Sequence, residues 1–142
     1  MTNSNKPTAV FWIIGIVALI WNILGVGAYL AQAYMTDEIK AALPQADQDM
    51  YNNMPAWVTA AFAIAVFAGL LGCIALLMRK SWAVPLFGLS LLGVLGQQVY
   101  NFFMQDYIEI SGSRMIMPIV VVIVAFFLLY YARGLKSKGM LT

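Results

Sequence analysis

The sequence has no histidine and only one cysteine, Cys73, which lies inside an apolar run. A lone cysteine cannot form a disulfide within the chain. Without histidine the chain cannot build a histidine-ligated zinc or haem site, a Cys-His or Ser-His nucleophile pair, or the commonest proton shuttle. No end of an apolar stretch places a nucleophile beside a base. We therefore expect no enzymatic activity and no cofactor.

Charge is also scarce. Charged residues make up 10% of the 142 residues and hydrophobic residues 63%, whereas about a quarter of the residues of a soluble protein are charged. This composition indicates one membrane domain covering residues 1–142, with the lipid bilayer as its main partner. The net charge of +2 is small, and no nucleic-acid partner is expected.

Four long apolar stretches account for most of the chain: residues 8–34, 56–78, 82–104 and 115–133. They carry no Asp, Glu, Lys or Arg except Arg133 at the last boundary. At 1.5 Å rise per residue, helices of these lengths cross the roughly 30 Å hydrocarbon core of a bilayer. The expected fold class is an all-α integral membrane four-helix bundle. The first stretch exceeds the apolar region of a secretory signal, so we expect it to be retained even though Ala31-Gln32-Ala33 resembles a cleavage site.

Basic residues gather on one side of this arrangement. Four crossings bring the N-terminal residues, the 79–81 turn and the C-terminal tail together, with six basic residues and no acid: Lys6, Arg79, Lys80, Arg133, Lys136 and Lys138. The other connections, 35–54 and 105–114, hold all six acids and only two basic residues. The positive-inside rule therefore predicts cytoplasmic termini and external acidic loops.

The first acidic loop is expected to be partly helical. Thr36 can cap a short helix with Asp37 and Glu38 in its first turn, and a second short helix is expected from Gln45 to Asn52. The loop has no glycine-punctuated calcium sequence, so no metal site is expected. Aromatic residues near the span ends, such as Tyr34 and Trp57, are expected to anchor the spans at the headgroup level.

Asn22, near the middle of the first span, should point toward protein or trapped water because lipid offers no hydrogen-bond partner. Counting from it by threes and fours collects a stripe of small or polar residues: Gly15, Ala18, Gly25, Tyr29 and Gln32. The opposite faces are expected to meet lipid: Phe11, Ile13, Val17, Ile20, Leu24 and Leu30.

The third span carries three carboxamides within five residues, Gln97, Gln98 and Asn101, on a stripe that continues through Ser90, Gly93 and Tyr100. Together with the first stripe and mid-span Trp21, they give the candidate solute-lining residues: Asn22, Gln32, Gln97, Gln98, Asn101, Trp21, Tyr29 and Tyr100. Two interpretations stay open. The amides line a cavity for a neutral solute, or they bond to one another and to backbone carbonyls, contributing about 0.6 to 2 kcal/mol each to assembly.

The second span has a seam of small residues, which let helix backbones approach closely in lipid. The expected helix-packing positions are Gly25, Ala61, Ala65, Gly69, Gly72 and Gly93. The fourth span has Ala125 as its only small residue before Ala132, so we expect it to be the most exposed to lipid.

Several segments carry a resemblance to a known group: Phe11 to Gly15, Trp21-Asn22, Ala28-Tyr29-Leu30, Gln32 to Asp37, Pro55-Ala56-Trp57 and Gln98 to Phe103. The chain resembles small, uncharacterised four-span bacterial inner-membrane proteins that are often labelled "sugar transporter". The resemblance implies a bacterial inner-membrane location and a transport role. The chain differs from small sugar transporters with three-helix repeats, because it has four spans and its Pro44-Gln45 pair lies in a loop.

Two functional hypotheses follow. The first is a multi-pass membrane protein, alone or as a homo-oligomer, that binds or passes a neutral polar solute such as a sugar. Coupled transport is disfavoured because coupled carriers usually hold ionisable groups at depth in the membrane. The second hypothesis is a non-transporting accessory protein that packs against a larger membrane complex through its small-residue seam.

Overall fold

The computed structural model describes residues 8–105 and 112–142, without the side chains of Ser113 and Arg114. Lys6 and the acids Asp106 and Glu109, which are expected on opposite sides of the membrane, lie outside the described residues. Every described element is helical. The elements are α1 (Ala9–Ala33), α2 (Asp37–Ala41), α3 (Gln45–Asn52), α4 (Ala56–Leu77), α5 (Ala83–Val99), a π-helical turn (Tyr100–Met104), a 3₁₀ turn (Gly112–Met115) and α6 (Ile116–Ser137).

The expected fold class is confirmed: the structure is all-helical, and α1, α4, the continuous α5 and π turn, and α6 are long and apolar enough to cross a membrane. The helix starts follow local chemistry. Oγ1 of Thr8 and of Thr36 each accepts a hydrogen bond at 3.2 Å from a backbone N–H three residues on, that of Phe11 and Ile39 respectively. The predicted Thr36 cap and the short helices α2 and α3 are therefore confirmed.

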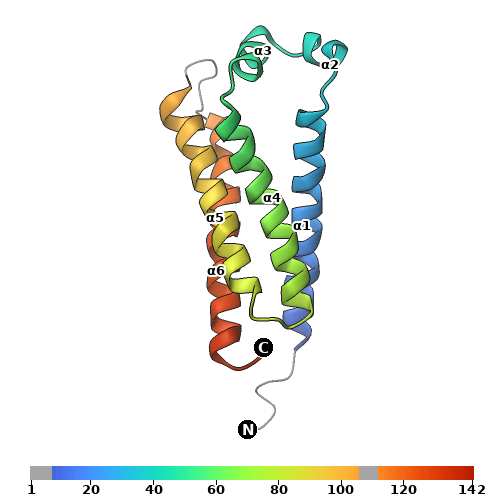
Figure 1. Ribbon diagram of the computed structural model, residues 1–142, viewed down its shortest axis with the longest axis vertical. Helices are drawn as coiled ribbons and strands as arrows, with labels where there is room; N and C mark the ends of the chain where they lie inside the picture. Colours follow the sequence, from blue (N-terminus) through green and yellow to red (C-terminus); the bar gives the residue numbers. More distant parts are fainter. Residues whose placement is uncertain (1–7, 106–111) are drawn as a thin grey trace.

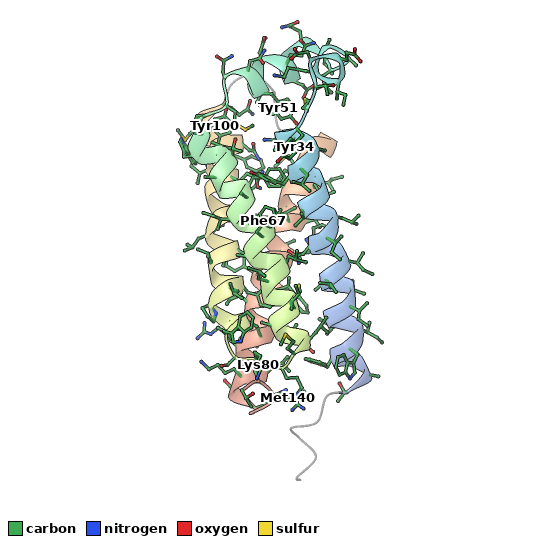
Figure 2. All side chains as sticks on the ribbon, turned by 45° about the vertical axis from the view of Figure 1, so that its right-hand side comes forward. Tyr34, Tyr51, Phe67, Lys80, Tyr100 and Met140 are labelled. Carbon is green, nitrogen blue, oxygen red and sulfur yellow. The ribbon has the colours of Figure 1, made fainter. Side chains whose placement is uncertain are left out.

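The four long helices pack in chain order, as Figure 1 shows. Neighbouring pairs are α1 with α4, α4 with α5, and α5 with α6, each antiparallel, whereas α1 and α6 do not pack closely. The start of α1, the 79–81 turn and the last residues share one end, here called the termini end. Helices α2 and α3 lie at the other, the loop end. In Figure 2, Lys80 and Met140 mark the termini end, and Tyr34, Tyr51 and Tyr100 lie toward the loop end.

The termini half of the bundle is filled by a hydrophobic core that includes Phe11, Cys73, Phe87 and Leu128. Phe11 is only 1% exposed, so the prediction that it faces lipid is wrong. The reason is that the C-terminal residues turn back under this end, where Met140 and Leu141 join the same core. The other residues assigned to lipid, including Val17 and Leu24, are exposed.

The two helices that end at the termini end stop in the same way. After α4, Lys80 N–H donates to the Ala75 carbonyl at 2.8 Å, and Arg79 has a positive φ of 60°. After α6, Met140 N–H donates to the Leu135 carbonyl at 3.0 Å, and Gly139 has φ 78°. Both are Schellman endings. Helix α6 therefore continues to Ser137, past the predicted boundary at residue 133, because Leu135 is buried in the core and the stop lies at Gly139.

Helix α6 is the least buried of the four, with 17% of its most apolar window buried, against 44% for α4. This confirms the expectation drawn from its few small residues. Helix α1 is similar at 22%. The two outer helices of the row thus meet lipid most, and they flank the pocket described next.

Candidate solute-binding pocket

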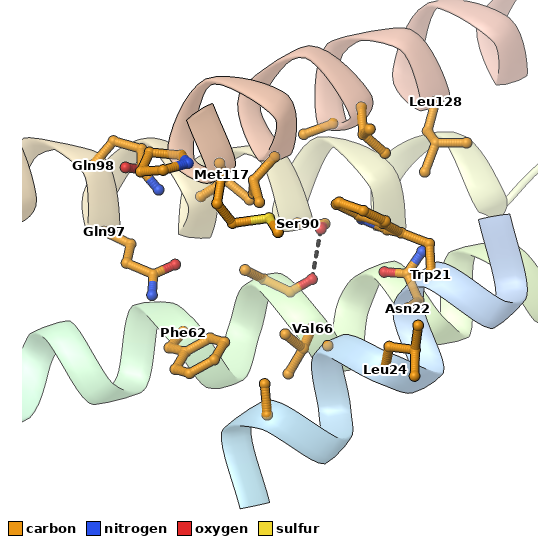
Figure 3. Close-up of a pocket in the computed structure, with 18 of the residues that line it drawn as sticks. Trp21, Asn22, Leu24, Phe62, Val66, Ser90, Gln97, Gln98, Met117 and Leu128 are labelled. Atoms are coloured by element: carbon orange, nitrogen blue, oxygen red, sulfur yellow. Dashed lines mark hydrogen bonds between the residues drawn. The ribbon is translucent and has the colours of Figure 1, made fainter. Parts of the chain in front are cut away.

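A pocket of about 440 Å³ lies among the four long helices, in the half of the bundle nearer the loop end. Residues of α1 and α6 form its two sides, and residues of α4 and α5 form its floor, as Figure 3 shows. Pockets that bury small molecules measure roughly 300 to 1,000 Å³. This one is therefore large enough for a solute of modest size.

Asn22 is the polar residue on the α1 side, and it is 8% exposed. Its Nδ2 donates to the Ala18 carbonyl at 2.9 Å and to Cys73 Sγ at 3.3 Å. Its Oδ1 lies against Gly69 and accepts no hydrogen bond from the residues that the structure describes. No described side-chain polar atom is both fully enclosed and unpartnered, so this oxygen is not fully enclosed. Asn22 thus fits both interpretations of the interior amides. Its nitrogen bonds to α4 through Cys73, and its oxygen keeps its hydrogen-bonding capacity for a ligand or water.

Ser90 on α5 faces Asn22 across the floor. Its Oγ donates to the Ala65 carbonyl of α4 at 2.6 Å, the dashed line in Figure 3. A Cβ on Gly69 would lie 3.1 Å from the same Oγ. Gly69 therefore allows α1, α4 and α5 to meet at this depth, and the two polar side chains form the inner end of the pocket.

The carboxamides of Gln97, Gln98 and Asn101 line the pocket toward the loop end. Gln97 reaches from α5 toward α4 in Figure 3 and has no hydrogen-bond partner among the described residues. Asn101 Nδ2 donates to Gln98 Oε1 at 3.4 Å, a long bond. Most of the hydrogen-bonding capacity of these three amides therefore remains for water or a solute.

A change of helix type occurs at this amide group. The third span is α-helical only to Val99 and then forms a π turn, in which Gln105 N–H donates to the Tyr100 carbonyl at 3.0 Å. Gln105 Nε2 also donates to the Asn101 carbonyl at 3.0 Å, which fixes the turn. Short π segments often occur at functional sites. From the sequence, residues 82–104 were expected to form one uniform span, and the hydrophobic pattern did not predict this turn.

Trp21 also lines the pocket, so this mid-span aromatic closes a cavity rather than only facing lipid. Three other candidates do not line it. Tyr29 packs edge-on against Phe62 and Phe67 of α4. Gln32 Nε2 donates to Met54 Sδ at 3.5 Å.

Tyr100 is the third candidate outside the pocket. It is 4% exposed and packs edge-on against Trp57, with ring centroids 6.1 Å apart. The helix periodicity placed it on the amide stripe, but its ring lies between helices against Trp57. The stripe therefore gives Ser90, Gln97 and Asn101 as lining residues, whereas Tyr100 does not line the pocket.

The expected helix-packing residues lie at close approaches between helices. A Cβ added at Gly72 would lie 2.8 Å from the Phe87 ring, and one at Gly25 would lie 3.2 Å from Val66. A Cβ added at Gly93 would lie 2.6 Å from the Ala61 carbonyl oxygen and 2.8 Å from the Ala65 nitrogen. A Cβ added at Gly69 would overlap the Asn22 oxygen. All these neighbours belong to α1, α4 and α5. The small-residue seam is therefore occupied by helices of the same chain.

Sequence reasoning missed the α6 wall, which consists of Met117, Pro118, Val121, Val124, Ala125 and Leu128. A signal was present: counting from Ala125 by threes, fours and sevens gives Leu128, Val121 and Pro118. The signal is weak because apolar residues on α6 suit lipid as well as a pocket wall. None of the described residues that line the pocket is Asp, Glu, Lys or Arg, and the part of the chain that the structure describes contains no cluster of metal-ligating side chains.

The pocket therefore offers hydrogen bonds without charge. Comparisons with protein-family models, with curated proteins and with solved structures give no match to this chain. The resemblance to small four-span bacterial proteins and its transport label accordingly stay an expectation from the sequence.

Proposed function

We propose that this protein is a multi-pass membrane protein of the bacterial inner membrane that binds and passes an uncharged, hydrogen-bonding solute such as a sugar. One observation supports this most: Gln97, Gln98, Asn101 and the Asn22 oxygen open into one pocket with most of their hydrogen-bonding capacity unused. Buried polar groups normally have partners. Unpaired amides within a span therefore favour a site that is filled by water or by a solute.

The absence of charge in the pocket lining selects the class of solute. A charged solute leaving water for this site would meet no counter-ion among the described lining residues, and an uncompensated charge within the membrane costs at least about 2.5 kcal/mol. A neutral molecule with hydroxyl or amide groups avoids that cost and can bond to the carboxamides. In the proposed orientation both termini are cytoplasmic, as the positive-inside rule predicts.

Flux into liposomes that contain the purified chain tests this proposal. Radiolabelled glucose and glycerol serve as neutral probes, and gluconate serves as a charged one. The double variant Gln97→Leu, Asn101→Leu should reduce uptake of the neutral probes to that of empty liposomes, while circular dichroism shows an unchanged helix content. Gluconate uptake should remain at the background level throughout.

A matched control removes the same two amide types outside the pocket. Gln45 and Asn53 belong to the α3 segment, where Gln45 bonds to Asp49 in an exposed position. The variant Gln45→Leu, Asn53→Leu should transport as the native chain does. If the pocket variant still transports, the solute route lies elsewhere. If the native chain passes neither glucose nor glycerol, the proposal that it passes small polar solutes is wrong.

The accessory-protein hypothesis relied on the small-residue seam as a docking surface. Close approaches within the chain already use Gly69, Gly72 and Gly93. No observation on the described residues favours that hypothesis over the pocket.

A further inference from the structure

The pocket has two chemically different walls. The α5 side and the π turn present Ser90, Gln97, Gln98 and Asn101, whereas every lining side chain from α6 is apolar. A free sugar carries hydroxyl groups around its whole edge, and those that face α6 would lose their partners on binding. Burying a hydroxyl group without a hydrogen-bond partner is unfavourable. The walls therefore fit a molecule with a polar part and an apolar part.

The opening of the pocket faces the bilayer. Helices α1 and α6 form its sides but do not pack closely against each other. Leu24 of α1 and Met117 of α6 both line the pocket and yet are 66% and 60% exposed. Leu24 lies well inside the α1 span, and Met117 lies at the loop end of α6. Because both are on helices that can span a membrane, the side of the pocket between α1 and α6 is expected to open toward lipid.

The inner end of the pocket is closed. Leu128 belongs both to the pocket lining and to the core cluster that fills the termini half of the bundle with Phe11, Cys73 and Phe87. Among the described residues, the pocket lining reaches no nearer to the termini end than Trp21 of α1 and Leu128 of α6. A ligand in this pocket therefore borders the hydrophobic core on that side and has its openings toward α1 and α6 and toward the loop end.

We propose that the ligand of this pocket is a neutral amphiphile: an uncharged polar head group held by Gln97, Asn101 and the Asn22 oxygen, and an alkyl chain that leaves along α6 between Leu24 and Met117 into the bilayer. This inference rests on the proposed function and narrows its solute to a lipid-like class. The volume of about 440 Å³ takes a head group of sugar size together with the first methylenes of a chain.

Trp21 provides a reporter inside the pocket. The other three tryptophans, Trp12, Trp57 and Trp82, are between 43% and 46% exposed, and Phe substitutions remove their emission. The test titrates this single-tryptophan chain in lipid nanodiscs with glucose, decyl glucoside and decyl sulfate. The first two share a head group, and the last two share a chain. We expect saturable changes in Trp21 emission, with decyl glucoside half-saturating at a concentration at least about tenfold below glucose, the gain from two buried methylenes.

Two substitutions on α6 locate the binding. Val121 lines the pocket, and Val121→Phe should occupy space at the apolar wall and weaken decyl glucoside binding at least about tenfold. Ile123 is 60% exposed and does not line the pocket, so Ile123→Phe should leave decyl glucoside binding unchanged. A chain that retains Trp12 alone tests for a general effect of the amphiphile on the bilayer. An equal, unsaturable response there would overturn the inference.

The remaining outcomes separate the two proposals. Equal half-saturation by glucose and decyl glucoside would refute the amphiphile and leave the neutral-solute function standing. Tighter binding of decyl sulfate than of decyl glucoside would refute the uncharged ligand and, with it, the proposed function. No saturable response to decyl glucoside would refute the amphiphile, while the liposome flux measurement decides the function independently.

Discussion

Gly69 of α4 lies so close to Asn22 of α1 that a Cβ at residue 69 would overlap the Asn22 oxygen. The same added carbon would lie 3.1 Å from Ser90 Oγ of α5. Helices α1, α4 and α5 therefore meet at Gly69, where the absence of a side chain leaves room for the Asn22 and Ser90 side chains at the inner end of the pocket. Space at Gly69 is a condition for this arrangement of polar groups.

Replacing Gly69 with alanine should destabilise the protein by about 1 to 3 kcal/mol, the usual cost of overpacking a tightly packed interior. Unfolding by SDS in mixed micelles, followed by circular dichroism, measures this. Part of the loss should be recovered by adding Asn22→Ala, since the two sites share one contact and their effects will not add.

Gly27→Ala and Gly88→Ala are matched controls, because an added Cβ at either position meets nothing within 4 Å. Both should be neutral or stabilise their helices by up to about 1 kcal/mol, through the higher helix propensity of alanine. Equal stability of the Gly69 and Gly27 variants would show that the close approach at Gly69 is not energetically important.

Arg79 adopts a left-handed backbone conformation at φ 60° that ordinarily favours glycine. Its Nε donates to the Met140 carbonyl at 3.1 Å, which ties the 79–81 turn to the C-terminal residues. Arg79→Ala loses that bond and keeps the backbone strain, whereas Arg79→Gly loses the bond and relieves the strain. The glycine variant should therefore be the more stable of the two by about 1 kcal/mol, measured by the same unfolding assay.

Lys80→Ala removes a neighbouring exposed cation from the same turn and should leave stability within about 0.5 kcal/mol of the native value. An alanine variant at position 79 as stable as the glycine variant would contradict the assignment of strain to that backbone.

Cysteine labelling in intact cells tests the orientation in the membrane. Ala46→Cys in α3 and Ser137→Cys at the end of α6 are both exposed and lie at opposite ends of the bundle. The positive-inside rule predicts that a membrane-impermeant maleimide labels Ala46→Cys from outside, and labels Ser137→Cys only after permeabilisation.

The native chain is the control, because its one cysteine, Cys73, is fully buried. It should not react under either condition. Labelling of both introduced cysteines from the same side would contradict a bundle with four crossings.

Tyr51 lies on α3, outside the spans, and its pKa is raised above the ordinary value by partial burial and then by the Asp47 carboxylate one turn before it. Asp47→Asn removes the smaller cause, so the pKa should fall while staying above the ordinary value of about 10. The Cζ chemical shift of ¹³C-labelled tyrosine, followed through an alkaline titration, measures this.

The sign of the effect on stability follows from the direction of the shift. A raised pKa means that the folded protein holds the phenol proton more tightly than the unfolded chain does. The corresponding stability is complete below the ordinary tyrosine pKa and is lost as the pH rises through the raised value. Asp37→Asn in α2 should not move the Tyr51 titration, and a pKa unchanged in the Asp47→Asn variant would exclude the carboxylate as a cause.

Much of the pocket was predictable because lipid cannot satisfy a polar group. This constraint alone identified Asn22, Gln97, Gln98 and Asn101 as inward-facing, and all four line the pocket. Gln32 was also expected to line the pocket and does not. Near the loop end its amide donates a hydrogen bond to Met54 Sδ instead. A polar residue near the end of a span has more ways to be satisfied than one at mid-depth.

Periodicity was less informative about apolar residues. It assigned Phe11 to lipid, although Phe11 is buried in a core cluster that also contains Met140 and Leu141 of the C-terminal residues. It also gave no reason to place Val121 and Leu128 in a pocket wall. An apolar side chain on a membrane helix is equally stable against lipid and against protein, so composition does not distinguish these surroundings.

The sequence by itself determined the number of apolar helices, their approximate positions, the cap at Thr36, and spans without charged residues before Arg133, because bilayer thickness and backbone chemistry act on short stretches of chain. Only the tertiary structure decided which helices touch. Glycines at 69, 72 and 93 let α1, α4 and α5 approach closely, and their partners come from distant parts of the chain. Helix α6 packs less closely on α1 than the neighbouring helices pack on one another, and the pocket lies among all four helices, because nothing in lipid drives two apolar surfaces together unless their shapes fit.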